Sequence, residues 1–199
     1  RDVLEALRQP LEDGVITVSR AAGTLQFPSR FVLVAAMNPC PCGKLTDPTQ
    51  DCVCTQSQIN RYRRKISGPI VDRIDLHVEV PKISYEKLTA ETEEGETSSQ
   101  VAERVKLARQ IQGQRFKNDN NVSTNAEMGL EQIKKYCQPE PAGQELLRAA
   151  VNHHHLSPRA YHRLLKVSRT IADLTGQETI KQLHISEALQ YRPKEDQNY

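Results

Sequence analysis

The chain has 199 residues and a formal net charge of +2, which is close to neutral. Hydrophobic residues make up 37% and charged residues 26%, a balance that excludes a collagen-like or mainly disordered chain. No apolar run approaches the roughly 20 residues of a membrane helix, and no signal peptide opens the chain, so we expect a cytoplasmic protein with no membrane partner. Because the whole-molecule charge is small, any surface that binds nucleic acid must be local.

The N-terminal residues predict a helix followed by a hairpin. Apolar residues at helical spacing predict a helix over residues 2–12, which an Asp-Gly turn signal ends. Two short β-type runs, Val15–Val18 and Leu25–Phe27, flank a turn that contains glycine and predict a β-hairpin. The helical pattern begins at Arg1 without an initiating Met, so we expect the chain to be a piece of a longer protein.

Two later runs predict strands of a parallel sheet. Residues 31–36 are continuously apolar, as in a strand buried on both faces, and the run stops before Pro39. Residues 74–80 alternate between apolar and polar and predict a second strand, and a polar, basic stretch over residues 56–65 predicts a helix between them. We therefore expect residues 1–84 to form part of an α/β core, with a truncated parallel sheet and the hairpin.

The remainder of the chain is helical in pattern. Residues 85–100 are acidic and rich in Ser and Thr, which predicts an exposed linker, and residues 101–199 predict an all-α domain. The clearest helix is Pro158–Leu174, with Ser157 as its N-cap and Gly176 after its end. Other helices are expected over residues 101–111, 130–137, 146–151 and 186–191.

Four of the five cysteines lie close together in the sequence, which favours a metal site over disulfides in a chain without a secretory signal. Two close pairs separated by a short loop can close a tetrahedral thiolate site on zinc. The one-residue spacer within each pair departs from the two to four residues usual in structural sites, so a disulfide or a reduced structural loop stays open. The predicted ligands are Cys40, Cys42, Cys52 and Cys54, whereas Cys137 lies on an apolar helical face and is expected in the core.

Two polar residues near the predicted sheet could act on a phosphate. Asn38 follows the first predicted strand, where its amide could orient a water or contact a phosphate, although Asn-Pro also starts turns. Arg73 follows a Gly-Pro turn, and we expect it to project outward beside Asp72, where it could reach a phosphate on a neighbouring subunit. The structural alternative is a surface ion-pair cluster.

Cationic and imidazole groups in the helical part are weaker indications of a binding site. Arg159, Arg163 and Lys166 lie opposite the apolar stripe of their helix, and Arg159 is in the first turn, where the helix dipole favours an anion. The alternative is a solvated helix face. The run His153–His155 ends a helix and lacks nearby cysteines or paired carboxylates, so we do not expect it to bind metal.

The order of these features resembles the later part of an AAA+ ATPase of the magnesium-chelatase-like family, in its ComM/YifB branch, and the resemblance covers essentially the whole chain. The most specific stretches are Leu7–Gly14, Ala36–Gly43, Ser67–Pro69, Asp72–Asp75, Leu156–Arg163 and Ser168–Leu174. The resemblance implies a partial AAA+ core in residues 1–84 and a helical lid in residues 101–199.

By position, the resemblance assigns roles to individual residues. Asn38 is similar to sensor 1, which senses the γ-phosphate, and Arg73 to the arginine finger that completes a neighbour's ATP site. Arg159 is similar to sensor 2, which reaches from the lid to bound nucleotide. The hairpin is similar to the one that related helicases point into their central channel, which would make Arg20 a DNA contact. The cysteine group also belongs to this branch.

One departure limits what the chain can do alone. It contains neither the Gly-rich phosphate loop nor the apolar strand ending in Asp-Glu that holds magnesium, both of which precede this region in the family. We therefore expect this piece alone neither to bind ATP tightly nor to hydrolyse it. The intact protein is expected to use ATP and Mg²⁺, to form a ring of six identical subunits, and to move along single-stranded or branched DNA in recombination or natural transformation.

Two other functions fit the sequence. One is an AAA+ ATPase of the chelatase type that remodels a protein partner. The other is a zinc-containing module without enzymatic activity, which binds nucleic acid through the cations of residues 61–65. These cations are Arg61, Arg63, Arg64 and Lys65.

Overall fold

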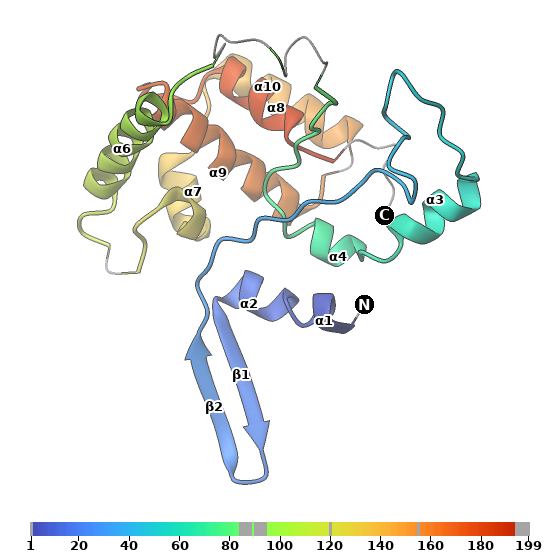
Figure 1. Cartoon of the computed structure of the whole chain (residues 1–199). Coiled ribbons are helices and arrows are strands. Elements are labelled where there is room, and N and C mark those ends of the chain that lie inside the picture. The colour runs from blue at the N-terminus through green and yellow to red at the C-terminus, as the bar shows by residue number, and fades with distance from the viewer. Residues whose placement is uncertain (1, 84–88, 90–94, 120, 155, 194–199) are drawn as a thin grey trace. The chain divides into compact units, whose positions relative to one another are not determined.

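The computed structural model describes residues 2–83, 89, 95–119, 121–154 and 156–193. These fall into two compact units. Of these residues, the first unit comprises 2–74 and 78–83, and the second comprises 75–77 and the described residues from 89 to 193. The described chain is mostly helical and carries one two-stranded antiparallel hairpin (Figure 1). Across the described ranges, no helix is both long and apolar enough to cross a bilayer.

The N-terminal helix is broken into α1 (Asp2–Glu5) and α2 (Arg8–Asp13). Pro10 explains the break, because it has no N–H to donate to the carbonyl of Ala6 and its ring excludes that carbonyl from the helical position. Gly14 ends α2 in the left-handed region, with φ of 65°, and its N–H donates to the Pro10 carbonyl. The expectation of one continuous helix over residues 2–12 is therefore wrong.

The predicted hairpin is confirmed as β1 (Val15–Arg20) and β2 (Gly23–Pro28), the two blue arrows of Figure 1. Ile16 pairs with Phe27 and Val18 pairs with Leu25, so alternation places these four apolar side chains on one face. All four are exposed, between 38% and 65%. Among the described residues, the hairpin forms a two-stranded sheet by itself.

The two predicted parallel strands are not strands in this structure. Residues 31–36 and 74–80 have no ladder partner, and no parallel sheet occurs within the described part of the chain. A strand exists only when a neighbour takes up its backbone N–H and C=O groups. The apolar side chains of these segments are accordingly exposed, with Val32 and Val34 each at 89% and Val80 at 86%.

Two short helices complete the described elements of the first unit. The predicted helix after the cysteines is confirmed as α3 (Gln56–Arg63). It begins with a capping box in which the Thr55 hydroxyl accepts from the Gln58 N–H and the Gln58 side chain accepts from the Thr55 N–H. A four-residue helix, α4 (Gly68–Val71), follows and buries Ile70 and Val71.

The second unit has a continuous apolar core built around α9. Leu164 is 1% exposed, and Ile180 and Ile185 are completely buried against the same cluster. Helix α9 contacts α6, η1, α7 and α10, while α10 also contacts α8. The elements are α6 (Ser98–Arg115), the 3₁₀ turn η1 (Asn125–Glu127), α7 (Leu130–Tyr136), α8 (Pro141–His153), α9 (Pro158–Leu174) and α10 (Gln182–Gln190).

The sequence prediction for α9 is confirmed in detail. The Ser157 hydroxyl accepts from the Ala160 N–H at 3.2 Å, Pro158 occupies the first turn, and Gly176 follows the helix with φ of 66°. Helix α10, by contrast, begins four residues before the expected start at residue 186. The expected linker over residues 85–100 lies mostly outside the described residues, and α6 begins at Ser98.

A buried ionic network joins the helices of the second unit. Both Asp173 oxygens accept hydrogen bonds from Arg115, at 2.5 and 2.7 Å, and Asp173 also accepts from Arg169 at 3.1 Å and from Asn125 at 2.7 Å. Arg169 further donates to the carbonyls of Gln177 and Glu178. Each buried charge therefore has an opposite charge or oriented dipoles around it, which such groups need in a low-dielectric interior.

Candidate functional site

The four predicted metal ligands come together in the first unit. The Sγ atom of Cys40 lies 3.3 Å from that of Cys42 and 3.7 Å from that of Cys52, and the Cys42–Cys52 distance is 3.6 Å. The sulfurs of these three residues and of Cys54 all lie within 4.8 Å of one another. A tetrahedral zinc with Zn–S bonds of about 2.3 Å requires sulfurs about 3.8 Å apart. The cluster therefore could hold a metal ion such as zinc, and all four cysteines are free thiols.

The loop that carries the cysteines is held by its own hydrogen bonds. The Gly43 N–H donates to the Cys40 carbonyl at 3.0 Å, and Gly43 has φ of 77°, a backbone conformation that favours glycine. Asp47 accepts from the Thr49 N–H and hydroxyl, and Lys82 donates to Asp47 at 3.1 Å. The Thr49 hydrogen bonds and the Lys82 ammonium lower the pKa of Asp47 to about 2. The thiols are thus brought together by a fixed loop.

The thiols differ in acidity. The backbone at Lys44 and the Cys40 side chain stabilise the Cys42 thiolate and lower its pKa to about 6, whereas desolvation and Cys42 raise the pKa of Cys54 to about 12. Cys42 therefore loses its proton more readily than Cys54. Because metal ligands must be thiolates, binding of a metal would displace the protons that the other thiols retain.

Helix α3 directly follows the cysteine loop, and its C-terminal end is basic. Cys54 immediately precedes Thr55, the N-cap of α3. Within the helix, Ile59 is buried at 4%. Cationic residues occupy its last turn and the two positions after it, and Lys65 lies 5.9 Å from the centre of the Tyr62 ring. These cations are Arg61, Arg63, Arg64 and Lys65.

Asn38, the predicted sensor, lies beside the cysteine loop. Its side chain is exposed, and its amide would be 3.8 Å from a Cβ atom placed on Gly43. Asn38 therefore borders the candidate metal site. Its proposed contact with nucleotide stays a prediction.

Arg73, the predicted arginine finger, does not project outward as the sequence suggested. Its guanidinium is paired with Glu12 and donates to the Pro69 carbonyl at 2.6 Å, and its side chain is only 8% exposed. Its buried Nε has no hydrogen-bond partner among the described residues. No spacing rule could have identified Glu12, which lies 61 residues away in the sequence. The role of Arg73 stays a prediction.

The three cations of α9 do not form one solvated face. Arg159 is exposed at the helix start, whereas Arg163 pairs with Asp75 at 3.5 Å. Lys166 donates to the Ala126 carbonyl at 2.9 Å, and burial lowers its pKa. Of the three, Arg159 is the exposed one, and its contact with nucleotide stays a prediction.

The remaining predicted residues are also located. Arg20 pairs with Gly23 beside the two-residue turn of the hairpin and is exposed. His153 and His154 are exposed at the end of α8, and His155 lies outside the described residues. Cys137 is 1% exposed in the core, as expected, and burial raises its pKa to about 11.

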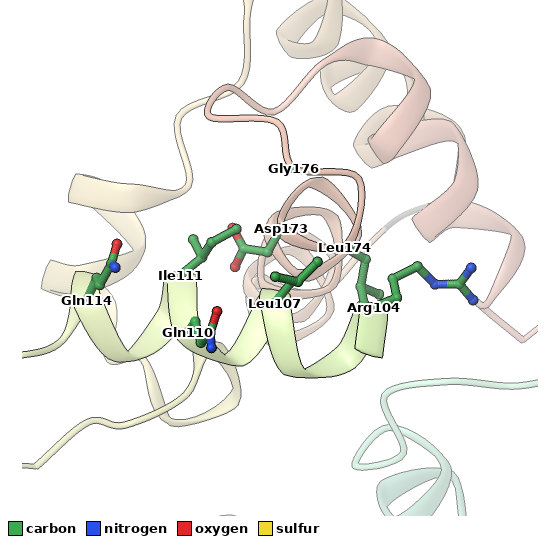
Figure 2. A pocket seen from close by; sticks show the side chains of 8 residues that line it. All are labelled: Arg104, Leu107, Gln110, Ile111, Gln114, Asp173, Leu174 and Gly176. Carbon is green, nitrogen blue, oxygen red and sulfur yellow. The ribbon is translucent and has the colours of Figure 1, made fainter. Parts of the chain in front are cut away.

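A pocket between α6 and the end of α9 contains no catalytic group (Figure 2). Of the residues that line it, the charged ones are Arg104 and Asp173. Arg104 is paired with Glu96 at 2.5 Å, and Asp173 belongs to the ionic network of the core. The other lining residues are aliphatic, amide or glycine residues: Leu107, Gln110, Ile111, Gln114, Leu174 and Gly176.

Comparison with known proteins gives the family. Residues 1–88 match the sequence profile of magnesium chelatase, subunit ChlI, and residues 95–192 match that of the C-terminal part of the same subunit. The chain belongs to the magnesium chelatase ChlI-like family. The two matches follow one another along the chain, in the order expected from the sequence.

Several relatives within the ChlI-like family are similar over almost the whole chain. Competence protein ComM of Haemophilus influenzae is 48% identical over 192 residues, which are 96% of this chain and 36% of that protein. YifB of Escherichia coli is 40% identical over 192 residues, and an uncharacterized protein of Mycobacterium tuberculosis is 40% identical over 189. The chain thus spans about a third of the length of these curated relatives and corresponds to their C-terminal part.

Proposed function

We propose that the protein containing this chain is a ring-forming ATPase that couples ATP hydrolysis to movement along DNA during recombination or natural transformation. The observation that carries the proposal is the match of both successive parts of the chain to magnesium chelatase ChlI profiles. The relative named as a competence protein supports a role in transformation. The chain alone lacks a phosphate-binding loop, so ATP and Mg²⁺ act only in the longer protein.

In this proposal the chain supplies the residues that sense nucleotide. Asn38 acts as sensor 1, Arg159 as sensor 2, and Arg73 as the finger that completes the site of a neighbouring subunit. Residues 31–36 and 74–80 join a parallel sheet with strands from elsewhere in the protein, which is supported by their exposed apolar side chains.

The position of Arg73 has a consequence for this mechanism. Its guanidinium is held by Glu12 and the Pro69 carbonyl, so it must leave these partners before it can reach a phosphate on another subunit. Assembly of the ring would then compete with an ion pair inside the subunit. A carboxylate and a phosphate each offer two oxygens to the planar guanidinium fork of arginine, so a phosphate can replace Glu12 as its partner.

The arginine finger is tested by Arg73→Ala in the full-length protein. Loss of a finger costs on the order of 10³–10⁵ in hydrolysis rate, because the developing charge on the phosphate is no longer neutralised. We expect ATP binding to be retained. Arg8→Ala is the matched control, because Arg8 forms an exposed pair with Glu5 in the same unit. Near-normal turnover in Arg73→Ala contradicts the assignment.

The nature of the substrate is tested by hydrolysis with and without single-stranded and branched DNA. Strong stimulation supports a DNA motor, with the hairpin residue Arg20 as the next position to replace. Hydrolysis that DNA does not change favours the alternative, an ATPase that remodels a protein partner.

A further inference from the structure

We propose that the end of α3 binds the phosphate backbone of nucleic acid, and that a metal held by the four cysteines fixes this surface in place. The surface is called the α3 patch and consists of Arg61, Arg64 and Lys65. The inference rests on the proposed function only in expecting DNA as the ligand. It names a contact surface other than the hairpin.

The charge of this region is strongly one-sided. Between Cys52 and Val71 the chain has four cationic residues and no acidic one, although the whole chain is nearly neutral. Arg61, Arg64 and Lys65 are exposed, and none of them forms an ion pair with a carboxylate of the described residues. Three unpaired cations within five positions repel one another, and a row of phosphates relieves this repulsion.

Helical geometry turns two of the three cations to the same side. With about 100° of rotation per residue, Arg61 and the C-cap Arg64 project within about 60° of one another, opposite Ile59, and Lys65 follows directly after them. Ile59 is 4% exposed and anchors α3 to the first unit. Arg63 projects close to Ile59 and is half-buried, so it is not part of the patch. The patch is therefore an ordered surface.

The metal site and the patch are connected through the backbone. Cys54 precedes the N-cap Thr55, whose capping box fixes the start of α3. A metal that binds Cys52 and Cys54 would therefore hold the first turn of the helix, and the patch lies less than three turns further on. Loss of the metal frees this end of α3 and spreads the three cations.

Two features favour nucleic acid over other anionic surfaces. The half-buried Tyr62 ring lies among the cations, where it offers a face for stacking with a base. A membrane-binding helix would instead present large apolar side chains beside its cations, and in α3 the aliphatic residue, Ile59, is buried. The hairpin has the opposite character, with an exposed apolar face and a single cation, Arg20.

The patch is tested on the 199-residue chain with a fluorescent oligothymidylate, by anisotropy across a series of salt concentrations. The variant is Arg61→Gln/Arg64→Gln/Lys65→Gln, which keeps side-chain length and helix propensity. Each phosphate contact contributes about −0.7 to the slope of log K against log salt for single strands. We expect the variant to lower this slope by about 2 and to weaken binding at least about tenfold at low salt.

A matched control replaces three exposed cations of the second unit, Lys106→Gln/Arg109→Gln/Lys117→Gln, which carry the same charge change. This control is expected to bind like the unsubstituted chain. Equal metal content and circular dichroism in both variants show that folding is retained. If the patch variant binds as tightly as the control, or if Arg20→Gln alone removes binding, the inference is overturned.

The metal link is tested by chelation. Stripping the metal is expected to weaken oligonucleotide binding of the unsubstituted chain, to leave the patch variant unchanged, and to be reversed by added zinc. Fewer than about 0.2 zinc per chain in reduced protein, or binding that survives chelation, overturns the link, since four thiolates hold zinc tightly. Patch-dependent binding to vesicles of anionic lipid at equal strength overturns the assignment to nucleic acid.

Failure of the inference and failure of the proposed function are distinguishable. Full-length protein with the patch substitutions that keeps DNA-stimulated hydrolysis overturns the inference alone. A patch that binds the oligonucleotide in a protein whose hydrolysis ignores DNA overturns the proposed motor alone.

Discussion

The two units of the chain use similar aliphatic residues in opposite ways. In the second unit Leu164, Ile180 and Ile185 are buried in one continuous core. In the first unit Val32 and Val34 lie on extended backbone and are each 89% exposed. The second unit therefore carries within itself the packing that stabilises it. The first unit leaves these apolar segments exposed, and four of its cysteines lie together in one loop.

Charged residues show the same contrast. The second unit buries Asp173 together with Arg115 and Arg169 and satisfies all three. The first unit leaves the cations of the α3 patch on the surface. The network thus joins helices within the second unit, whereas the α3 patch, unlike the Arg73–Glu12 pair of the same unit, is exposed to solvent.

The largest expected difference between the two units is in their response to removal of metal. We expect chelation to expose the segment around residues 40–65 to protease, because the four thiols then lose the ion that joins them, whereas the melting of the second unit stays unchanged. Limited proteolysis with mass spectrometry identifies the cleaved bonds. Equal protection of residues 40–65 with and without chelator would show that the loop is stable without metal.

Asp173→Ala should damage the second unit alone. It leaves the guanidinium groups of Arg115 and Arg169 buried without a counter-charge, and breaking a buried pair in this way costs about 3–5 kcal/mol in the free energy of unfolding. Urea denaturation measures the change. Glu103→Ala is the control, because Glu103 forms an exposed pair with Lys106 and should change stability by less than about 0.5 kcal/mol. An equal effect of both substitutions would contradict a structural role for the network.

A smaller change in stability is expected from pH, again in the second unit. Burial and the positive charges of Arg169 and Lys181 lower the pKa of His184 below its ordinary 6.5. Its Nδ1 accepts from the Lys181 N–H at 3.0 Å, which requires the neutral ring. Below pH 6.5 the unfolded state binds more protons than the folded state, so stability falls as pH drops from 6.5 toward the lower pKa of the folded protein.

His184→Asn provides the comparison for this pH effect. An Asn oxygen can accept from the Lys181 N–H without titrating near neutral pH. We expect thermal stability of the unsubstituted chain to decline more steeply below pH 6.5 than that of the variant. Parallel curves would exclude His184 as the cause.

Local sequence predicted the elements whose stabilising contacts are local. Helix α9 follows from Ser157, Pro158 and its apolar periodicity, and the hairpin from two β-type runs around a turn. The break between α1 and α2 also has a local cause, because Pro10 is present in the sequence. The clustering of the cysteines followed from their spacing, and the structure confirms it.

Apart from the bounds of α1, α2 and α10, the failures concern contacts with distant residues. Residues 31–36 have the composition of a buried strand, but strand formation depends on a neighbouring strand that composition does not supply. Arg73 was expected to project outward because its neighbours in sequence suggest a surface turn, whereas Glu12 draws it inward. Likewise, no local pattern predicts that Arg115 of α6 reaches Asp173 of α9, which lies 58 residues away in the sequence.

The exposed apolar run at residues 31–36 has a consequence for the behaviour of the chain in solution. It is a six-residue window of aromatic, aliphatic and small residues with no charge and no proline, and its backbone has no ladder partner. Such a window has the composition of segments that stack into cross-β fibrils. In the sheet that we propose, the strands that pair with these residues therefore also protect the protein from aggregation.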